Sequence, residues 1–290
     1  MKKIFVFTVM AALVMSACSK NENPIDSNQM EFTAEYPTTR ATSSNFEEGD
    51  AMGVYVVKYE EEKAQPLQLY GNYANNVYSV YNGTKWVNTP AVYWEDGKFD
   101  VYAFYPYEKL PSVDEYIFEV ALDQSTPETD ESLSGYEASD FLWAKATGIS
   151  KMDAVPLLFK HRMSKLVINF IKGEDYSGDI PSEATVLIHS TVPAAVVDVA
   201  TGVVTKYGYE SPKTIKAKKV YDGVYTAIIV PQRLDNKLPF IEILSHGVSY
   251  LLESKFVFRS GMQHTINLVL NNNPEKVRIE LGGEIIDGWD

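Results

Sequence analysis

Apolar residues along the chain fall in short runs rich in Val, Ile, Tyr and Phe, and Gly, Pro, Asn and Asp separate these runs. The period of 3.6 residues that marks amphipathic helices is nearly absent. Runs of this length and composition are typical of β-strands, so the pattern predicts an all-β protein. The clearest strand candidates are residues 51–58, 99–105, 115–120, 164–171, 184–190, 224–230, 239–244, 248–258 and 263–270.

Turn signals separate many of these runs, for example NGT at 82–84, ATG at 200–202 and YDG at 221–223. Many short strands at this spacing favour β-sandwiches. The 290 residues exceed the usual size of one domain, and the polar, turn-rich stretch 172–181 lies near the middle. We therefore predict two sandwich domains, residues 41–172 and 173–290.

The N-terminus has the pattern of a secretory signal peptide over residues 1–17, with two lysines followed by an apolar run from Ile4 to Met15. The sequence MSAC at 15–18 resembles a bacterial lipobox, which predicts cleavage between Ala17 and Cys18 and lipidation of Cys18. Cys18 is the only cysteine of the chain, so an acylation site explains it better than an incidental thiol. The several acyl chains of a bacterial lipoprotein would anchor the protein stably to a membrane.

The chain is acidic, with a net charge of −13. Removal of the signal peptide takes away two lysines and leaves 24 basic against 39 acidic residues, a net charge of −15. Such a surface repels nucleic acids and anionic lipids, so we expect neither as a partner.

Residues 18–40 are predicted to form a lipidated tether and a removable strand. Met30, Phe32, Ala34 and Tyr36 alternate with polar residues, as in a strand with one buried face. The small polar residues after Pro37 indicate an accessible loop that a protease can cut. This loop holds Arg40, the only basic residue between Lys20 and Lys58.

Nothing in the sequence indicates an enzyme, a metal site or a cofactor. The four histidines, His161, His189, His246 and His264, lie far apart, and no nucleophile, zinc or phosphate-binding motif is present. The acidic stretch 122–136 could bind Ca²⁺ weakly, but it lacks the ligand spacing of a calcium loop, so a solvated loop is the better interpretation. Its acidic residues are Asp123, Glu128, Asp130 and Glu131.

The aromatic-rich stretch 89–107 permits two interpretations. It could form a platform on which sugars stack. However, both alternations of FDVYAFY at 99–105 are largely apolar, which favours a central strand buried on both faces.

Several segments, in order, resemble the fimbrillin family of Bacteroidales surface lipoproteins, the subunits of pili. These segments are the lipobox, TRAT with FEEGDAMGVY at 39–55, Trp86 through VYAFYPY at 101–107, VPLLFKHRMSKLVINF at 155–170, YTAIIVPQ at 225–232, and FRSGMQHTINLVL leading to EIIDGW at the C-terminus. The resemblance implies two transthyretin-like β-sandwich domains and export as a lipoprotein to the outer membrane and cell surface. It also implies assembly into fimbriae by strand exchange after an Arg-specific protease removes the N-terminal segment.

This resemblance gives Arg40 a role as the processing site, with cleavage between Arg40 and Ala41, and makes other pilus subunits the expected partners. A donor strand is also needed, and the candidate is the C-terminal strand with Val277, Ile279 and Leu281. The sequence ends at Asp290 with no additional strand beyond this one, which counts against a shaft role and leaves a tip, minor or anchor subunit open. The alternative is a surface lipoprotein that does not polymerise and binds a glycan or host ligand.

Overall fold

The structure is a computed structural model, and it describes residues 28–35, 45–130, 132–272, 278–280 and 289. Strands dominate these residues, and the one helix among them is the short 3₁₀ helix η1 (Glu137–Ser139). The predicted all-β class is therefore confirmed. No helix within the described ranges is long and apolar enough to cross a bilayer.

A six-stranded antiparallel sheet, with the order β4-β3-β2-β5-β7-β9, organises the first half of the chain. A separate parallel pair, β1 with β8, accompanies it. The strands of these two sheets are β1 (Phe32–Glu35), β2 (Ala51–Lys58), β3 (Ala74–Tyr81), β4 (Trp86–Thr89), β5 (Phe99–Tyr105), β7 (Leu142–Ile149), β8 (Val155–Leu158) and β9 (Lys160–His161).

The second half of the chain supplies most of the other three sheets, whose orders are β15-β16-β10-β19-β20, β14-β11-β17-β18 and β13-β12-β6. Their strands are β6 (Tyr116–Glu119), β10 (Ser164–Lys172), β11 (Thr185–Thr191), β12 (Ala194–Asp198), β13 (Val203–Lys206), β14 (Lys213–Lys216), β15 (Lys218–Tyr221), β16 (Val224–Ile229), β17 (Arg233–Ser245), β18 (Val248–Val257), β19 (Gln263–Leu270) and β20 (Arg278–Glu280).

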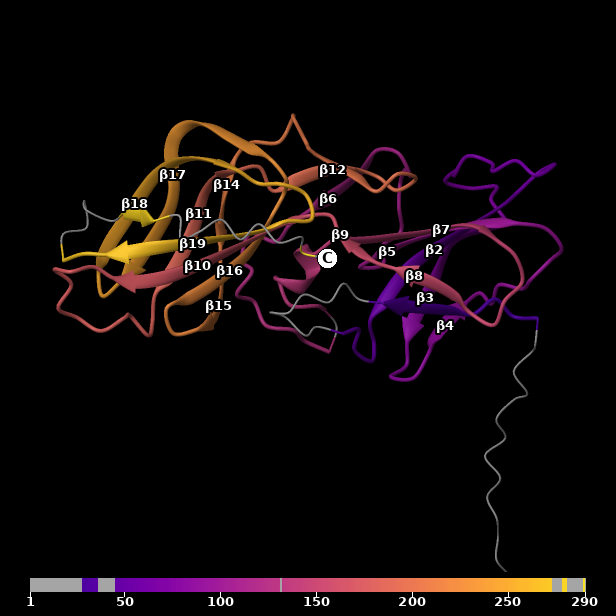
Figure 1. The fold of residues 1–290 in the computed structure, drawn as a ribbon, viewed down its shortest axis with the longest axis horizontal. Coiled ribbons are helices and arrows are strands. Elements are labelled where there is room, and N and C mark those ends of the chain that lie inside the picture. Colours follow the sequence, from indigo (N-terminus) through magenta and orange to yellow (C-terminus); the bar gives the residue numbers. More distant parts are fainter. Residues whose placement is uncertain (1–27, 36–44, 131, 273–277, 281–288, 290) are drawn as a thin grey trace, which may run out of the picture.

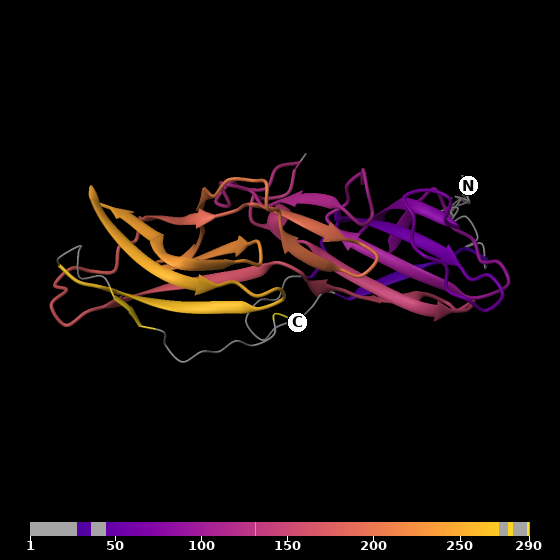
Figure 2. The same ribbon diagram turned by 90° about the horizontal axis from the view of Figure 1, so that it is seen from above.

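The molecule is elongated, with the six-stranded sheet in one half and the five- and four-stranded sheets in the other (Figure 1). The view from above shows the same lengthwise arrangement (Figure 2). Strands β6 and β12 lie in the middle and pair with each other, so one sheet contains strands from both halves of the chain.

The two central strands of the six-stranded sheet, β2 and β5, are buried on both faces, as the stretch 99–105 predicted for β5. Every residue of β5 is buried, and its side chains alternate between two hydrophobic clusters. Val101, Ala103 and Tyr105 belong to the smaller cluster, which also contains residues of β1 and β8. Tyr102 and Phe104 belong to the larger cluster, which continues into the sheets of the second half.

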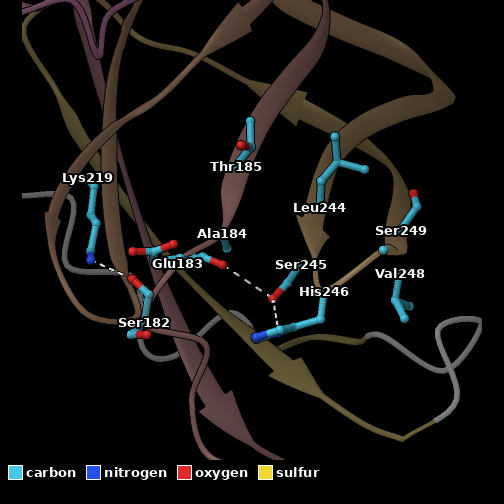
Figure 3. Close-up of a pocket in the computed structure, with 11 residues that line it drawn as sticks. Ser182, Glu183, Ala184, Thr185, Lys219, Leu244, Ser245, His246, Val248 and Ser249 are labelled. Atoms are coloured by element: carbon cyan, nitrogen blue, oxygen red, sulfur yellow. Dashed lines mark hydrogen bonds between the residues drawn. The ribbon is translucent and has the colours of Figure 1, made fainter.

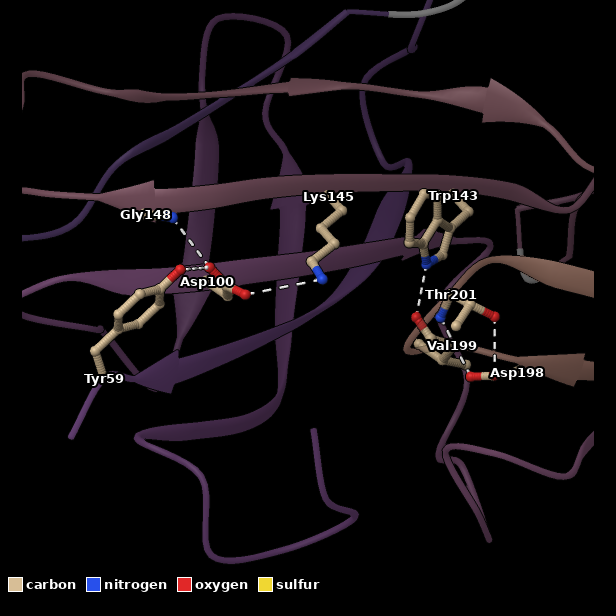
Figure 4. Close-up of polar contacts among 8 residues, drawn as sticks. All are labelled: Tyr59, Asp100, Trp143, Lys145, Gly148, Asp198, Val199 and Thr201. Atoms are coloured by element: carbon tan, nitrogen blue, oxygen red, sulfur yellow. Dashed lines mark hydrogen bonds and ion pairs between the residues drawn. The ribbon is translucent and has the colours of Figure 1, made fainter. Parts of the chain in front are cut away.

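A tryptophan of β7 joins the six-stranded sheet to a turn of the second half. The indole N–H of Trp143 donates to the carbonyl of Val199 at 2.7 Å (Figure 4). The turn is shaped by Asp198, whose carboxylate accepts hydrogen bonds from Thr201, and by Gly202 at φ +70°. A Cβ on Gly202 would lie 2.5 Å from the indole, so glycine is needed there for the close approach as well as for the backbone conformation.

A second polar cluster lies on the same sheet (Figure 4). The buried carboxylate of Asp100 accepts hydrogen bonds from the Tyr59 hydroxyl at 2.9 Å and the Gly148 amide at 3.0 Å, and Lys145 lies 3.8 Å away. These contacts satisfy a charged group in an otherwise apolar central strand.

The nine predicted strands are all present, with bounds that differ mainly at β17, which begins at Arg233 rather than residue 239. The division into domains at Lys172 stays a prediction. The strand pairing crosses it, because β10 lies before it and pairs with β16 and β19.

Candidate functional site: the groove of the N-terminal strand

Strand β1 lies in a groove between two other parts of the chain. On one side it runs parallel to β8, in a register that places Phe32 opposite Val155. On the other side the residues just before it pair with the segment that follows β4, through an antiparallel bridge between Gln29 and Tyr93. The N-terminal segment therefore fills a space between two walls.

Backbone hydrogen bonds hold the segment to both walls. Toward the segment after β4, the Trp94 amide donates to the Asn28 carbonyl and the Met30 amide donates to the Val92 carbonyl, both at 2.8 Å. Toward β8, the amide of Val155 donates to the carbonyl of Glu31 at 2.9 Å. Farther along, the Phe159 amide donates to the Glu35 carbonyl at 3.1 Å.

The side chains of this segment alternate between core and surface, as its sequence predicted. Met30 is 0% exposed and Phe32 is 3% exposed, and both belong to the smaller hydrophobic cluster. Ala34 is partly buried and packs against the same cluster, whereas Thr33 and Glu35 are exposed. Tyr36, the fourth predicted apolar position, lies outside the described residues.

Polar side chains contact the segment at defined positions. The Asn88 carboxamide donates to the Met30 carbonyl at 3.0 Å. At the start of the segment, the Asn28 side chain donates to the Trp94 carbonyl at 2.9 Å and accepts from the Lys151 ammonium group at 2.9 Å. The carboxylate of Glu31 lies 3.5 Å from the Lys85 ammonium group.

The proposed lipidation and processing sites lie outside the described residues. These are Ala17 and Cys18 at the signal cleavage site, and Arg40 and Ala41 after strand β1. Of the segment that cleavage at these sites would release, the structure describes residues 28–35. The chain resumes at Asn45, and Phe46 packs edge-on against Trp86 and Phe159 in the same cluster as Phe32.

The C-terminal region contributes strand β20, which pairs antiparallel with β19 and places Ile279 opposite Leu268. Val277 and Leu281 lie outside the described residues. Beyond them, the indole of Trp289 is buried and stacks on the imidazole of His161, with ring centroids 3.7 Å apart.

The charges around this stack are buried. His161 Nδ1 lies 2.9 Å from the Asp140 carboxylate, and the Lys165 ammonium group lies 5.6 Å from the Trp289 ring. Burial lowers the pKa of Lys165, and the charge of Asp140 opposes this shift.

The other candidate residues of the sequence, where the structure describes them, make separate contacts. In the described part of the chain, no group of three or more His, Cys, Asp or Glu side chains could hold a metal ion. Asp123 of the acidic loop accepts from the Ser125 hydroxyl and lies 3.2 Å from Lys216, and these contacts lower its pKa, the Ser125 hydrogen bond most of all. His189 pairs with Glu242 at 3.0 Å, away from His161.

A surface cavity of about 730 Å³ lies at the β17–β18 turn (Figure 3). Its lining is mixed, with Ser245, His246 and Ser249 on one side and Ser182 and Lys219 on the other. The Lys219 ammonium group donates to the Ser182 carbonyl, and the Ser245 hydroxyl contacts His246 Nδ1 at 3.0 Å.

Sequence reasoning missed both walls of the groove. Strand β8 was not predicted, because its run is short and contains Pro156. Apolar residues at every second position, Val155, Leu157 and Phe159, were the available signal, which the apolar Leu158 between them weakens. Asn88 lies in a four-residue strand, and nothing local to the sequence indicates that it contacts a segment 58 positions away.

Comparison with known proteins agrees with this architecture. The model of the family described as fimbrillin-like matches residues 39–289. The chain belongs to the fimbrillin-like family. A crystal structure of a candidate cell adhesion protein from Bacteroides uniformis is similar, with a TM-score of 0.67 and 20% identity over 91% of this chain and 98% of that one.

Two further structures share the fold. A candidate cell adhesion protein from Bacteroides ovatus has a TM-score of 0.63 and 19% identity, over 87% of this fimbrillin-like chain and 94% of its own. A fimbrial protein from Bacteroides vulgatus has a TM-score of 0.53 and 13% identity, over 91% of this chain and 100% of its own. A search of curated proteins finds no match. Family membership supports a fimbrial or adhesion-related subunit of a cell-surface appendage, which associates with other fimbrial subunits.

Proposed function

We propose that this fimbrillin-like protein is a non-enzymatic pilus subunit, structural or adhesive, that assembles by donor-strand exchange. It is exported as a lipoprotein acylated at Cys18 and held at the outer membrane. An Arg-specific protease then cuts between Arg40 and Ala41, and the segment with strand β1 leaves. A strand from another subunit, for which the C-terminal strand around Ile279 is the candidate, takes its place.

The observation that carries this proposal is the position of β1 in its groove. Burial of Met30 and Phe32 stabilises the core by roughly 3 to 6 kcal/mol, at about 1.5 to 3 kcal/mol for each side chain. A whole domain is stable by only about 5 to 15 kcal/mol. Release of the segment would therefore open the apolar core and free an edge of β8, which is the arrangement that accepts an added strand.

The experiment uses protein that begins at Ser19, before and after digestion with an Arg-specific protease. Native mass and light scattering follow its size. We expect an early cut after Arg40 and then a ladder of oligomers. The matched control is Arg40→Lys, which keeps the charge but removes the cleavage site, and it should stay monomeric under the same digestion. A cut product that remains a folded monomer at high concentration would contradict self-assembly.

That last result would favour the alternative of a surface lipoprotein that binds a glycan or host ligand. The cavity at the β17–β18 turn, with its hydroxyl, imidazole and ammonium groups, would then be the first surface to test (Figure 3). Binding of the uncut protein to a glycan array, together with a cut product that stays monomeric, would favour this alternative.

A further inference from the structure

The carboxamide of Asn88 is built into the wall of the groove. The side chain lies on the inward face of β4, beside Trp86, and Asn88 is 7% exposed. Its Oδ1 accepts from the hydroxyl of Ser79 at 2.7 Å, and Ser79 is 0% exposed. Its Nδ2 donates to the carbonyl of Met30. Since that carbonyl can only accept, the orientation of the amide is fixed by its two partners.

In the occupied groove, this amide N–H needs an acceptor on the strand, as the Met30 carbonyl provides. A buried donor without a partner costs about 1 to 3 kcal/mol, so the groove favours a strand that brings a carbonyl to this point. Carbonyls along a strand point alternately to its two edges. A shift of one residue would therefore turn the carbonyl away from Asn88 and turn the apolar side chains out of the core.

We propose that Asn88, held by Ser79, sets the register of the strand that occupies the groove, together with the buried Met30 and Phe32 positions. This inference rests on the proposed exchange of strand β1. A shift of two residues would restore a carbonyl at Asn88, but it would bring Ala34 to the place of Phe32. The groove thus selects a strand with large apolar side chains at the Met30 and Phe32 positions and a small one at the Ala34 position.

Charge adds a further condition between the two apolar positions. Glu31 faces Lys85 there, so an acidic residue is preferred. At the start of the groove, Lys151 and the Trp94 carbonyl bind the Asn28 side chain. From the Asn28 position to the Ala34 position, the groove therefore prefers a strand with this order of residues: an amide, any residue, a large apolar residue, an acid, a large apolar residue, any residue and a small residue.

The C-terminal region carries most of this order in Ile279-Glu280-Leu281-Gly282-Gly283, which matches Met30-Glu31-Phe32-Thr33-Ala34 position for position. Similar orders occur in β5 and β17, but each of those strands is paired on both edges. Strand β20 pairs with β19 alone and forms the edge of its sheet. The occupant is therefore residues 277–283 of a second copy, running in the direction of β1, with Val277 in place of Asn28 and without the contact to Lys151.

The test follows displacement of the native segment from the protease-cut chain that begins at Ser19. Fluorescent peptides of residues 28–36 and 277–284 are added, together with a 277–284 peptide in which Ile279 and Glu280 are exchanged. Binding is measured by anisotropy. We expect the first two to bind, the first more tightly, and the exchanged peptide to bind at least tenfold more weakly.

Register is measured separately with a photo-crosslinking residue at the Leu281 position of the peptide. In the wild-type protein the crosslinks should map next to Val155, the partner of Phe32. Asn88→Ala should weaken both peptides about tenfold and spread the crosslinks along β8. Asn88→Asp can still accept the hydrogen bond from Ser79 but cannot donate to the strand when ionised. It should therefore weaken binding and spread the crosslinks as Asn88→Ala does. Val87→Thr, at the exposed neighbour of Asn88, is the matched control.

The outcomes separate the two proposals. If neither peptide binds, strand β1 is not exchangeable, and the proposed function fails with the inference. If residues 28–36 bind and residues 277–284 do not, a second copy is the wrong occupant. If both bind and neither Asn88 variant changes the affinity or the crosslink position, Asn88 does not set the register.

Discussion

Replacement of Phe32 by alanine tests whether strand β1 is part of the core. Phe32 is 3% exposed and lies among residues of β2, β5 and β8. Truncation of a buried phenylalanine removes its apolar contacts and leaves a cavity, which typically costs about 3 to 5 kcal/mol. We expect Phe32→Ala to lose this amount of unfolding free energy in the uncut protein.

Urea unfolding followed by tryptophan fluorescence measures the loss. Trp86 and Trp94 belong to the same hydrophobic cluster as Phe32, so their emission reports on this core. With a denaturant slope of about 3 kcal/mol per molar urea, the midpoint should fall by about 1 M or more. The neighbouring side chain of Thr33 is exposed, and Thr33→Ala should change the stability by no more than about 0.5 kcal/mol.

Equal midpoints for Phe32→Ala and Thr33→Ala would refute this reasoning. The strand would then contribute no more to the core through its buried face than through its exposed face. The estimate of 3 to 6 kcal/mol for the released segment would also fall, and with it the reason to expect a vacant groove to recruit another strand.

Two further substitutions test other parts of the fold. Gly202→Ala should lower the stability by about 2 kcal/mol, because it strains a positive φ and places a Cβ 2.5 Å from Trp143. Thermal melting measures the loss, and Gly208→Ala, where no atom lies within 4 Å of the added Cβ, is the control. Equal losses of stability in the two variants would contradict this prediction. Folding lowers the pKa of Lys165. Between this folded-state pKa and the ordinary lysine value of about 10.4, the unfolded chain binds more protons than the folded chain. The stability of the wild type should therefore rise relative to that of Lys165→Met as the pH increases through this range. Urea unfolding at pH 8 and pH 10 measures the difference, and a difference that is independent of pH would contradict it.

Local sequence patterns predicted those strands in which the buried positions follow a regular order along the sequence. Strand β5 is apolar on both alternations and is buried throughout, and β1 alternates and is buried on one face. Both patterns follow directly from the geometry of a pleated strand. Weaker strands such as β13, which has one buried residue among four, carry no comparable pattern and were not predicted.

The partners of β1 could not be predicted, because pairing over long sequence distances leaves no local signal. Asn88 is an ordinary polar residue in a short strand until the fold places the Met30 carbonyl beside it. The stacking of Trp289 on His161 is of the same kind, since neither residue indicates the other. The sequence therefore predicted the candidate strand but neither wall of its groove.

The contacts of the N-terminal segment also determine when it can fold. The Lys151 ammonium group donates a hydrogen bond to the side chain of Asn28, although the two residues are 123 positions apart. Strand β1 likewise pairs with β8, which begins at Val155. Contacts over such distances form late, because the loop between them must first be closed. In the proposed export, the N-terminal segment leaves the translocation machinery before its partners near residue 151, so it cannot dock until they follow. Until it docks, the groove is without its strand, which is the state proposed to accept a strand from another subunit.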